Sequence, residues 1–251
     1  MFGSAVTQIC IALIVILILI IIRGKHLITF KLLLALFFMV YFIDNILMVL
    51  TNRFTGLQLI PSHIWDGFLI CNWSGKLYSI IFTLALLYLF GNILTKSEAG
   101  FTFHHALGSV LPSSIVVLAL AIWALIVGIA SPDGDLDLQA LLYLAIMPGL
   151  SEELVYRGYL LGLLNKIIPG RLRLLGAPVG WGVIVTSLLF GLLHGFWFDN
   201  TLTIHIEGIV LRNSMFSGLI FAWLRERTGS LLIPVVAHGL EDFLFFLPRM
   251  F

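Results

Sequence analysis

Long runs of apolar residues, separated by short polar connections, follow one another along the whole chain. A helix that crosses a bilayer needs about 20 mostly apolar residues. Eight runs approach this length, at residues 5–22, 30–50, 77–94, 107–130, 140–164, 181–198, 204–224 and 231–247. Continuous apolar runs satisfy their backbone in lipid as helices. The pattern therefore predicts an all-α, polytopic membrane protein with about eight transmembrane helices in one bundle.

The composition supports this interpretation and excludes a water-soluble globule. Of the 251 residues, 60% are hydrophobic and only 11% are charged, whereas about 25% of the residues in an ordinary soluble domain are charged. The net charge of +1 gives no reason to expect nucleic acid as a partner. The two cysteines, Cys10 and Cys71, have no metal or redox spacing, so we expect them to pack as small hydrophobic residues.

Basic residues gather in alternate connections, and this predicts how the helices are oriented. Cytoplasmic loops carry an excess of Lys and Arg, so both termini are expected outside the cytoplasm. The connection formed by residues 51–76 keeps several apolar residues and is expected to lie along the interface as an amphipathic stretch. Four connections hold nine basic residues, Arg23, Lys25, Lys31, Lys96, Lys166, Arg171, Arg173, Arg225 and Arg227, whereas the others hold Arg53, Lys76 and Arg249 together with the acidic Asp133, Asp135 and Asp137.

The fifth apolar run contains three charged residues, which lipid alone would not accommodate. A charged side chain at the centre of a spanning helix costs about 2.5–3.5 kcal/mol on insertion scales. Glu153 and Arg157 are spaced i, i+4 with the acid first, the favourable direction for a pair on one helix face. Glu152 is rotated by about 100° from Glu153. We therefore expect Glu152 to face elsewhere, without a local partner.

Two later runs contain histidines in similar settings. His194 follows Phe190 by one turn, and His238 precedes Asp242 by one turn, so each pair projects from one helix face. Pairs that served only local structure would have no reason to bring Glu, His and Asp together on three spans. The pattern therefore indicates one shared functional site. By contrast, residues 1–130 have only Asp44 as an acid within a span. We interpret 1–130 as four non-diagnostic transmembrane helices and 131–251 as the functional core.

Three short motifs within this core occur in order on successive spans: Glu152-Glu153-x-x-x-Arg157, Phe190-x-x-x-His194 and His238-x-x-x-Asp242. In this respect the chain resembles the CAAX protease and bacteriocin-processing family, also called the abortive-infection family, which includes the Ras-converting CAAX endopeptidases. The resemblance covers about residues 138–247. It implies an intramembrane endoprotease with a catalytic glutamate, a peptide or protein substrate in the membrane, and no cofactor.

The resemblance also implies roles for the motif residues. Glu152 with His194 activates water as general base, His238 and Asp242 hold the oxyanion of the tetrahedral intermediate, and Glu153 with Arg157 forms an orienting pair. Such a short chain with few loops is typical of a prokaryote, which implies a multi-pass protein of a prokaryotic cytoplasmic membrane.

Asp242 leaves the mechanism open, because many relatives carry Asn there and an ionised carboxylate only accepts hydrogen bonds. Asp242 is therefore protonated, or orients His238 as an imidazolium donor, or binds a metal. The last option is a zinc-dependent protease with His194, His238 and a carboxylate as ligands. The His-Glu-x-x-His signature of zinc proteases is absent from the sequence, which favours the glutamate. A non-catalytic immunity or assembly partner and a transporter are the alternatives outside enzymes.

Overall fold

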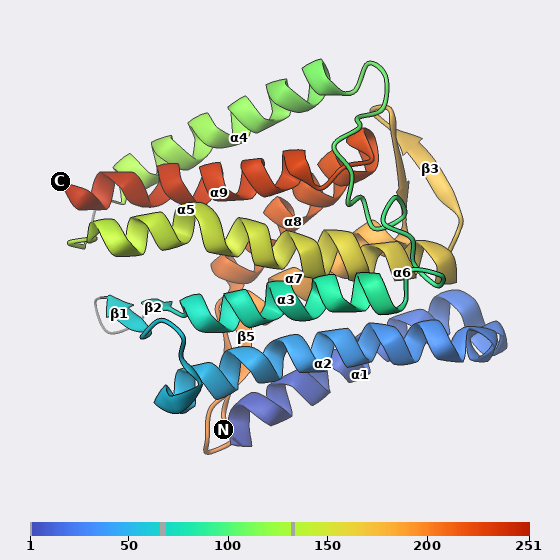
Figure 1. Ribbon diagram of the computed structural model, residues 1–251, viewed down its shortest axis with the longest axis horizontal. Coiled ribbons are helices and arrows are strands. Elements are labelled where there is room, and N and C mark those ends of the chain that lie inside the picture. The colour runs from blue at the N-terminus through green and yellow to red at the C-terminus, as the bar shows by residue number, and fades with distance from the viewer. Residues whose placement is uncertain (1, 66–68, 132–133) are drawn as a thin grey trace.

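A computed structural model gives the fold of residues 2–65, 69–131 and 134–251. Asp133, one of the predicted loop acids, lies outside the described residues. Within them the chain is mostly helical (Figure 1). The helices are α1 (Phe2–Arg23), η1 (Gly24–Phe30), α2 (Lys31–Arg53), η2 (Thr55–Leu57), α3 (Trp73–Leu89), α4 (Val110–Ala130), α5 (Leu138–Glu153), η3 (Leu154–Leu160), α6 (Leu161–Ile167), α7 (Trp181–Gly195), α8 (Gly208–Thr228), α9 (Leu232–Phe246) and η4 (Leu247–Met250).

Three two-stranded antiparallel hairpins connect some of these helices in the described part of the chain. Each hairpin is short and joins two helices, so the predicted helical class is confirmed. The strands are β1 (His63–Trp65) with β2 (Leu69–Cys71), β3 (Arg171–Leu174) with β4 (Ala177–Gly180), and β5 (Phe196–Phe198) with β6 (Ile204–Ile206).

Each of the eight apolar runs overlaps a helical stretch, but helix length alone does not establish eight membrane spans. Among the described residues, three stretches are long and apolar enough to cross a membrane. They are Gly3–Arg53, which includes α1, η1 and α2, Val110–Ala130 and Leu138–Ile167. α7 and α9 have 15 residues each and cover only about 22 Å at 1.5 Å per residue. The hydrocarbon core of a bilayer is about 30 Å thick, so these two helices reach across only part of it.

Two predicted boundaries were wrong because a hairpin replaces helix. The run 181–198 was expected to be helical throughout, but α7 ends at Gly195 and the next three residues form β5. Likewise, the first residues of the run 204–224 form β6, and α8 begins at Gly208. Tertiary contacts stabilise the hairpin: the backbone N–H of Phe198 donates to the hydroxyl of Thr7 on α1 at 2.8 Å.

The connection of residues 51–76 also differs from the prediction of one amphipathic stretch. It forms η2, the β1–β2 hairpin and then the first turn of α3, which begins at Trp73. Lys76 therefore lies inside a helix, not in a loop, and it is buried. The expectation that the two cysteines pack as small hydrophobic residues is confirmed. Cys71 is buried and Cys10, on α1, is partly buried, and both are free thiols.

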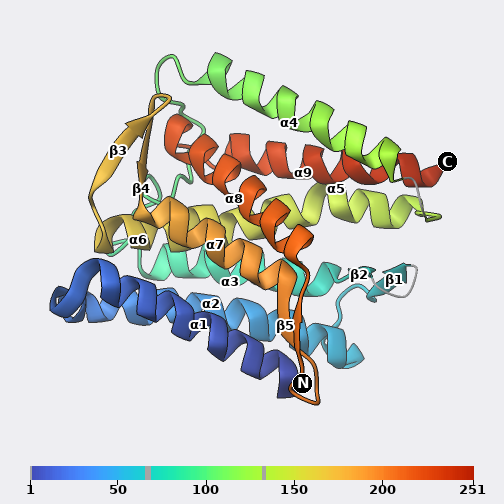
Figure 2. The ribbon, with the colours of Figure 1, turned by 180° about the vertical axis from the view of Figure 1, so that it is seen from behind.

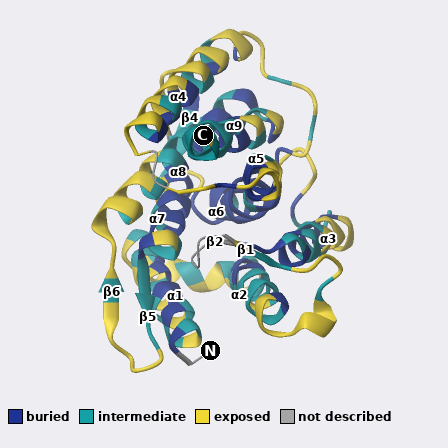
Figure 3. Ribbon diagram, turned by 90° about the vertical axis from the view of Figure 1, so that its left-hand side faces the viewer, coloured by how far each residue is buried: buried dark blue, intermediate teal, exposed yellow. Residues whose placement is uncertain are grey.

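The helices form layers in which α5, η3 and α6 make one continuous rod through the middle of the bundle (Figures 1 and 3). α1, α2 and α3 lie on one side of the rod, whereas α9, α8 and the outermost α4 lie on the other. The outward face of α4 exposes large apolar residues. Such a face suits contact with lipid.

The connections alternate between the two ends of the bundle, as Figures 1 and 2 show. Both termini lie at the end that also carries the β1–β2 and β5–β6 hairpins. The four connections with the nine basic residues, including η1 and the β3–β4 hairpin, lie at the opposite end.

Close contact between α5 and α9 depends on glycine. A Cβ atom on Gly239 would collide with the carbonyl oxygen of Ala145 on α5. A Cβ atom on Gly149 would lie 2.8 Å from the carbonyl oxygen of Val235 on α9. Small residues let membrane helices approach closely, and here they bring the histidine of α9 next to the glutamates of the rod.

Candidate active site

The central rod changes its helical geometry at the acidic motif. α5 ends at Glu153 and continues directly into η3, a π-helical segment whose seven residues are all buried. π-Helical turns inside α-helices are rare and frequently occur at functional sites. The apolar pattern of the sequence did not predict this segment, because the run reads as one uninterrupted helix.

The predicted ion pair of Glu153 and Arg157 is present at the centre of the bundle. Nη1 of Arg157 donates to Oε1 of Glu153 at 2.9 Å, and both side chains are fully buried. The guanidinium carbon lies 4.3 Å from the ring centre of Phe190 on α7 and 5.3 Å from that of Phe221 on α8. These cation–π contacts fix the rod against α7 and α8.

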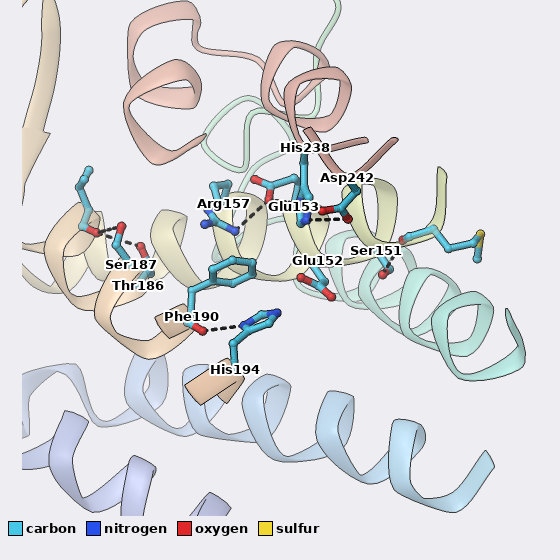
Figure 4. A network of polar contacts seen from close by, with 12 residues as sticks. Ser151, Glu152, Glu153, Arg157, Thr186, Ser187, Phe190, His194, His238 and Asp242 are labelled. Atoms are coloured by element: carbon cyan, nitrogen blue, oxygen red, sulfur yellow. Dashed lines mark hydrogen bonds and ion pairs between the residues drawn. The ribbon is translucent and has the colours of Figure 1, made fainter. Parts of the chain in front are cut away.

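His238 on α9 extends this network, with a carboxylate beside each ring nitrogen (Figure 4). Its Nδ1 lies 2.9 Å from Oε1 of Glu153, and its Nε2 lies 3.6 Å from Oδ2 of Asp242. An imidazolium carries a donor on both nitrogens, which matches this placement. Because 3.6 Å is too long for a hydrogen bond, Asp242 leaves the Nε2 donor available to another acceptor.

His194 lies at the end of α7, and its ring, like that of His238, lies beside the ring of Phe190. The ring centres of Phe190 and His194 are 4.5 Å apart, and those of Phe190 and His238 are 6.0 Å apart. Nδ1 of His194 lies 2.8 Å from the backbone carbonyl oxygen of Phe190. A proton on Nδ1 satisfies that carbonyl, so Nε2 of the neutral ring is an acceptor.

Glu152 points to the other side of the rod from Glu153, toward His194, as predicted from the rotation along the helix (Figure 4). Its Oε1 accepts a hydrogen bond from Nζ of Lys76 on α3 at 2.5 Å. Its Oε2 is buried and has no hydrogen-bond partner among the described residues. Glu152 and His194 line one cavity of about 160 Å³, together with Asp44 and Lys76.

The structure thus brings the six predicted site residues into two adjoining groups. Glu153, Arg157, His238 and Asp242 form a network on one side of the rod, whereas Glu152 and His194 meet at the cavity on the other. The expectation that Glu152 has no local partner holds only for its own helix, since α3 supplies Lys76.

Lys76 is a site residue that the sequence interpretation missed, as it missed the place of Asp44 in the cavity. Lys76 was assigned to a connection, although a signal for a polar helix face was present. Lys76, Ser79 and Thr83 are spaced i, i+3, i+7 within an otherwise apolar run, and this spacing puts them on one face. All three side chains are buried in the bundle.

The zinc alternative does not fit the described residues. No three His, Cys, Asp or Glu side chains within the described ranges converge in the manner of metal ligands. Nδ1 of His194 faces a backbone carbonyl, and Nδ1 of His238 faces Glu153. Each histidine therefore has one ring nitrogen engaged by a protein group, and no step of the mechanism is routed through a metal.

Comparison with known proteins supports a protease. Residues 135–244 match the model of a family described as type II CAAX prenyl endopeptidase Rce1-like. This match contains all six predicted site residues and confirms the resemblance to the CAAX protease family, a family of membrane proteases. α1 to α4 lie outside it. Neither a curated protein nor a solved structure matches the chain.

The buried ion pair gives a prediction for stability. Arg157→Ala leaves Glu153 in the interior without its cation, and breaking a buried pair costs about 3–5 kcal/mol. We expect a clearly lowered melting temperature in detergent, measured by tryptophan fluorescence. Arg173→Ala, which removes an exposed arginine of β3, serves as the control and is expected to melt like the wild type. Equal melting temperatures for the two variants would contradict a structural role for the pair.

Proposed function

We propose that this chain is an intramembrane endopeptidase that hydrolyses a peptide bond of a membrane-associated substrate, with Glu152 as the general base. One observation carries the proposal: the unpartnered Oε2 of Glu152 shares a cavity with His194. The adjoining network of His238 and Asp242 supplies a hydrogen-bond donor. The family match supports protease activity in general.

Water activation is the first step. Oε2 of Glu152 accepts a proton from a water molecule, whose oxygen attacks the carbonyl carbon of the scissile bond. Nε2 of His194 is a second acceptor and orients the same water. A positioned general base of this kind contributes typically 10²–10⁴-fold to the rate. At about 30 Å³ per water, the cavity of about 160 Å³ has room for a few such molecules.

Stabilisation of the intermediate follows. As the new C–O bond forms, the carbonyl electrons move to oxygen, and the Nε2–H of His238 donates to this oxyanion. Asp242 and Glu153 flank the imidazolium and stabilise its positive charge. When the C–N bond breaks, the proton held by Glu152 passes to the leaving nitrogen, and the carboxylate is restored. Donors preorganised toward an oxyanion act strongly in a site from which water is excluded.

The proposed location is the cytoplasmic membrane of a prokaryote, with eight crossings and both termini outside the cytoplasm. The gathering of nine basic residues at one end of the bundle supports this orientation. α7 and α9 are short, but α7 continues directly into β5 and α9 into η4, which extends these two crossings.

Reporter fusions test this topology. Alkaline phosphatase is active only outside the cytoplasm, so we expect activity when it is fused after Phe251. A green fluorescent protein inserted after Lys96, in the connection between α3 and α4, is expected to fluoresce inside the cell. Phosphatase fused at Lys96 is the matched control and is expected to be inactive. The opposite pattern, or equal activity at both positions, would contradict the orientation.

Glu152→Gln tests the general base. The amide keeps the size of the side chain but has no basicity, so we expect the turnover to fall about 10²–10⁴-fold. The assay uses the full chain in lipid vesicles and an internally quenched peptide that ends in an S-farnesylated CAAX sequence. Proteomics of membrane peptides, with active and inactive protein, extends the search to other substrates.

Glu241→Gln is the matched control for this variant. Glu241 is a half-buried acid of α9 that accepts a hydrogen bond from Ser217 at 2.7 Å, and the mechanism does not use it. We expect Glu241→Gln to keep turnover within a few-fold of the wild type. Near-wild-type turnover of Glu152→Gln would contradict the assignment of Glu152 as the general base.

Asp242→Asn separates the glutamate mechanism from a zinc enzyme. An amide donates a hydrogen bond to an oxyanion, so we expect turnover within about tenfold of the wild type. Asp242→Leu supplies neither a carboxylate to stabilise the imidazolium of His238 nor an amide donor. Because the oxyanion donor is weakened, we expect a loss of up to about 10²–10³-fold. Elemental analysis of the wild-type protein accompanies the assay. Stoichiometric zinc together with an inactive Asp242→Asn would overturn the glutamate mechanism.

A further inference from the structure

We infer that Lys76, on α3 and outside the family match, is a positioning residue that holds Glu152 in the orientation needed to activate water. This inference rests on the proposed function, because it assigns Lys76 a task toward the same general base. It goes beyond the family match, since the matched residues 135–244 include no part of α1 to α4.

The placement of Lys76 depends on the start of α3, which is fixed to the end of α2. The side chain of Asn72 caps α3 by accepting a hydrogen bond from the backbone N–H of Gly75 at 2.8 Å. Its amide also donates to the carbonyl oxygen of Met48 at 3.1 Å and to the hydroxyl of Thr51 at 2.8 Å, both on α2. The backbone of Lys76, in the first turn of α3, is thus held in place relative to α2.

Close packing reinforces this attachment. A Cβ atom at Gly75 would lie 2.5 Å from Nδ2 of Asn72 and 2.7 Å from the hydroxyl oxygen of Thr51, so α2 and α3 meet where only glycine fits. Ser74 is fully buried. Its hydroxyl accepts a hydrogen bond from the backbone N–H of Ile60 and donates one to the carbonyl oxygen of Ile60, each at 2.9 Å. The first turn of α3 therefore has little freedom to move relative to the connection that precedes it.

α3 presents polar side chains to acids on two neighbouring helices. Lys76 binds Glu152 of α5 at 2.5 Å. Ser79, on the same face of α3, donates to Oδ1 of Asp44 on α2. Asp44 also lines the cavity that Glu152, Lys76 and His194 share. α3 therefore links the carboxylate of the rod to the N-terminal helices.

The contact leaves the two oxygens of Glu152 in different situations. Oε1 is held by Lys76, whereas Oε2 is buried without a hydrogen-bond partner among the described residues. A carboxylate anchored through one oxygen presents the other in a defined direction. Lys76 and Glu152 are both largely buried, with 10% and 17% of their side chains exposed, so solvent screens this pair weakly.

A lysine that only stabilised the fold would affect stability but not the rate per folded molecule. A lysine that positions the base lowers kcat in the folded protein, while KM changes little, because a positioning ammonium acts through Glu152 and not on the substrate. A displacement of about 1 Å in a catalytic group costs about 10²-fold in rate. These consequences separate the two roles.

The experiment compares Lys76→Met and Lys76→Arg in the full chain, with the farnesylated CAAX peptide as probe. We expect Lys76→Met to lower kcat about 10²-fold with KM within about threefold of the wild type. Lys76→Arg keeps a cation and is expected to recover kcat to within about tenfold. Lys166→Met is the matched control, because Lys166 pairs with Glu98 at 2.9 Å at the far end of the rod. We expect that variant to keep the wild-type kcat.

Melting temperatures test the contact without any substrate. Lys76→Met leaves the carboxylate of Glu152 buried without a cation and is expected to lower the melting temperature by roughly 6–15 °C. In a Glu152→Gln background the same substitution is expected to lower it by less than half as much, because no buried charge is left unpaired.

The two measurements distinguish the possible failures. A wild-type protein that cleaves no probe counts against the proposed function, whereas the melting temperatures still report on the contact. Equal effects of Lys76→Met in both backgrounds would overturn the contact. An unchanged kcat in Lys76→Met, or a loss of kcat that Lys76→Arg does not restore, would overturn the positioning role even if the contact is confirmed.

Discussion

Charge buried in an apolar bundle must be paired, and the ion pair of Glu153 with Arg157 is where this requirement shapes the structure. Arg157 lies between aromatic rings of α7 and α8, and Glu153 also receives His238 of α9. Five elements, α5, η3, α7, α8 and α9, therefore meet at this ion pair. If this pair were absent, an unpaired charge would remain in the interior, at a cost of several kcal/mol. The packing of the C-terminal helices thus follows from the need to neutralise one arginine.

Two adjacent glutamates face different surroundings because a helix rotates by about 100° per residue. Glu153 is fully buried and contacts Arg157 of the rod and His238 of α9, whereas Glu152 faces the cavity and α3. Each glutamate keeps one oxygen without a hydrogen-bond partner among the described residues, but only Glu152 lines the cavity, where a proton acceptor can meet water. Glu153 is held by a guanidinium and an imidazole, which suits a structural role. The rotation of one residue along the helix thereby separates the proposed base from the structural ion pair.

The N-terminal helices take part in the site, although they were interpreted as plain lipid-embedded helices. Asp44 and the polar face of α3 were signs of this in the sequence, and Asp44 lines the cavity with Lys76 and Glu152. The cap at Asn72 and the contact at Gly75 attach α3 to α2. The cavity therefore has walls from both halves of the chain, and the division at residue 130 does not separate the site from the rest.

The sequence by itself determined the features that depend on neighbours along one helix. Apolar runs predict helices wherever they are long enough, and the spacings of Glu153 with Arg157 and of His238 with Asp242 predict pairs on one face; both pairs are present. Contacts between helices were decided by the tertiary structure alone. The partner of Glu152 is a residue 76 positions away along the chain. α7 ends where the following hairpin forms a hydrogen bond to α1. The π-helical segment after Glu153 was likewise not evident from the sequence. The physical reason is that local periodicity fixes which face of a helix a side chain occupies, whereas the group that meets this face depends on how the helices pack.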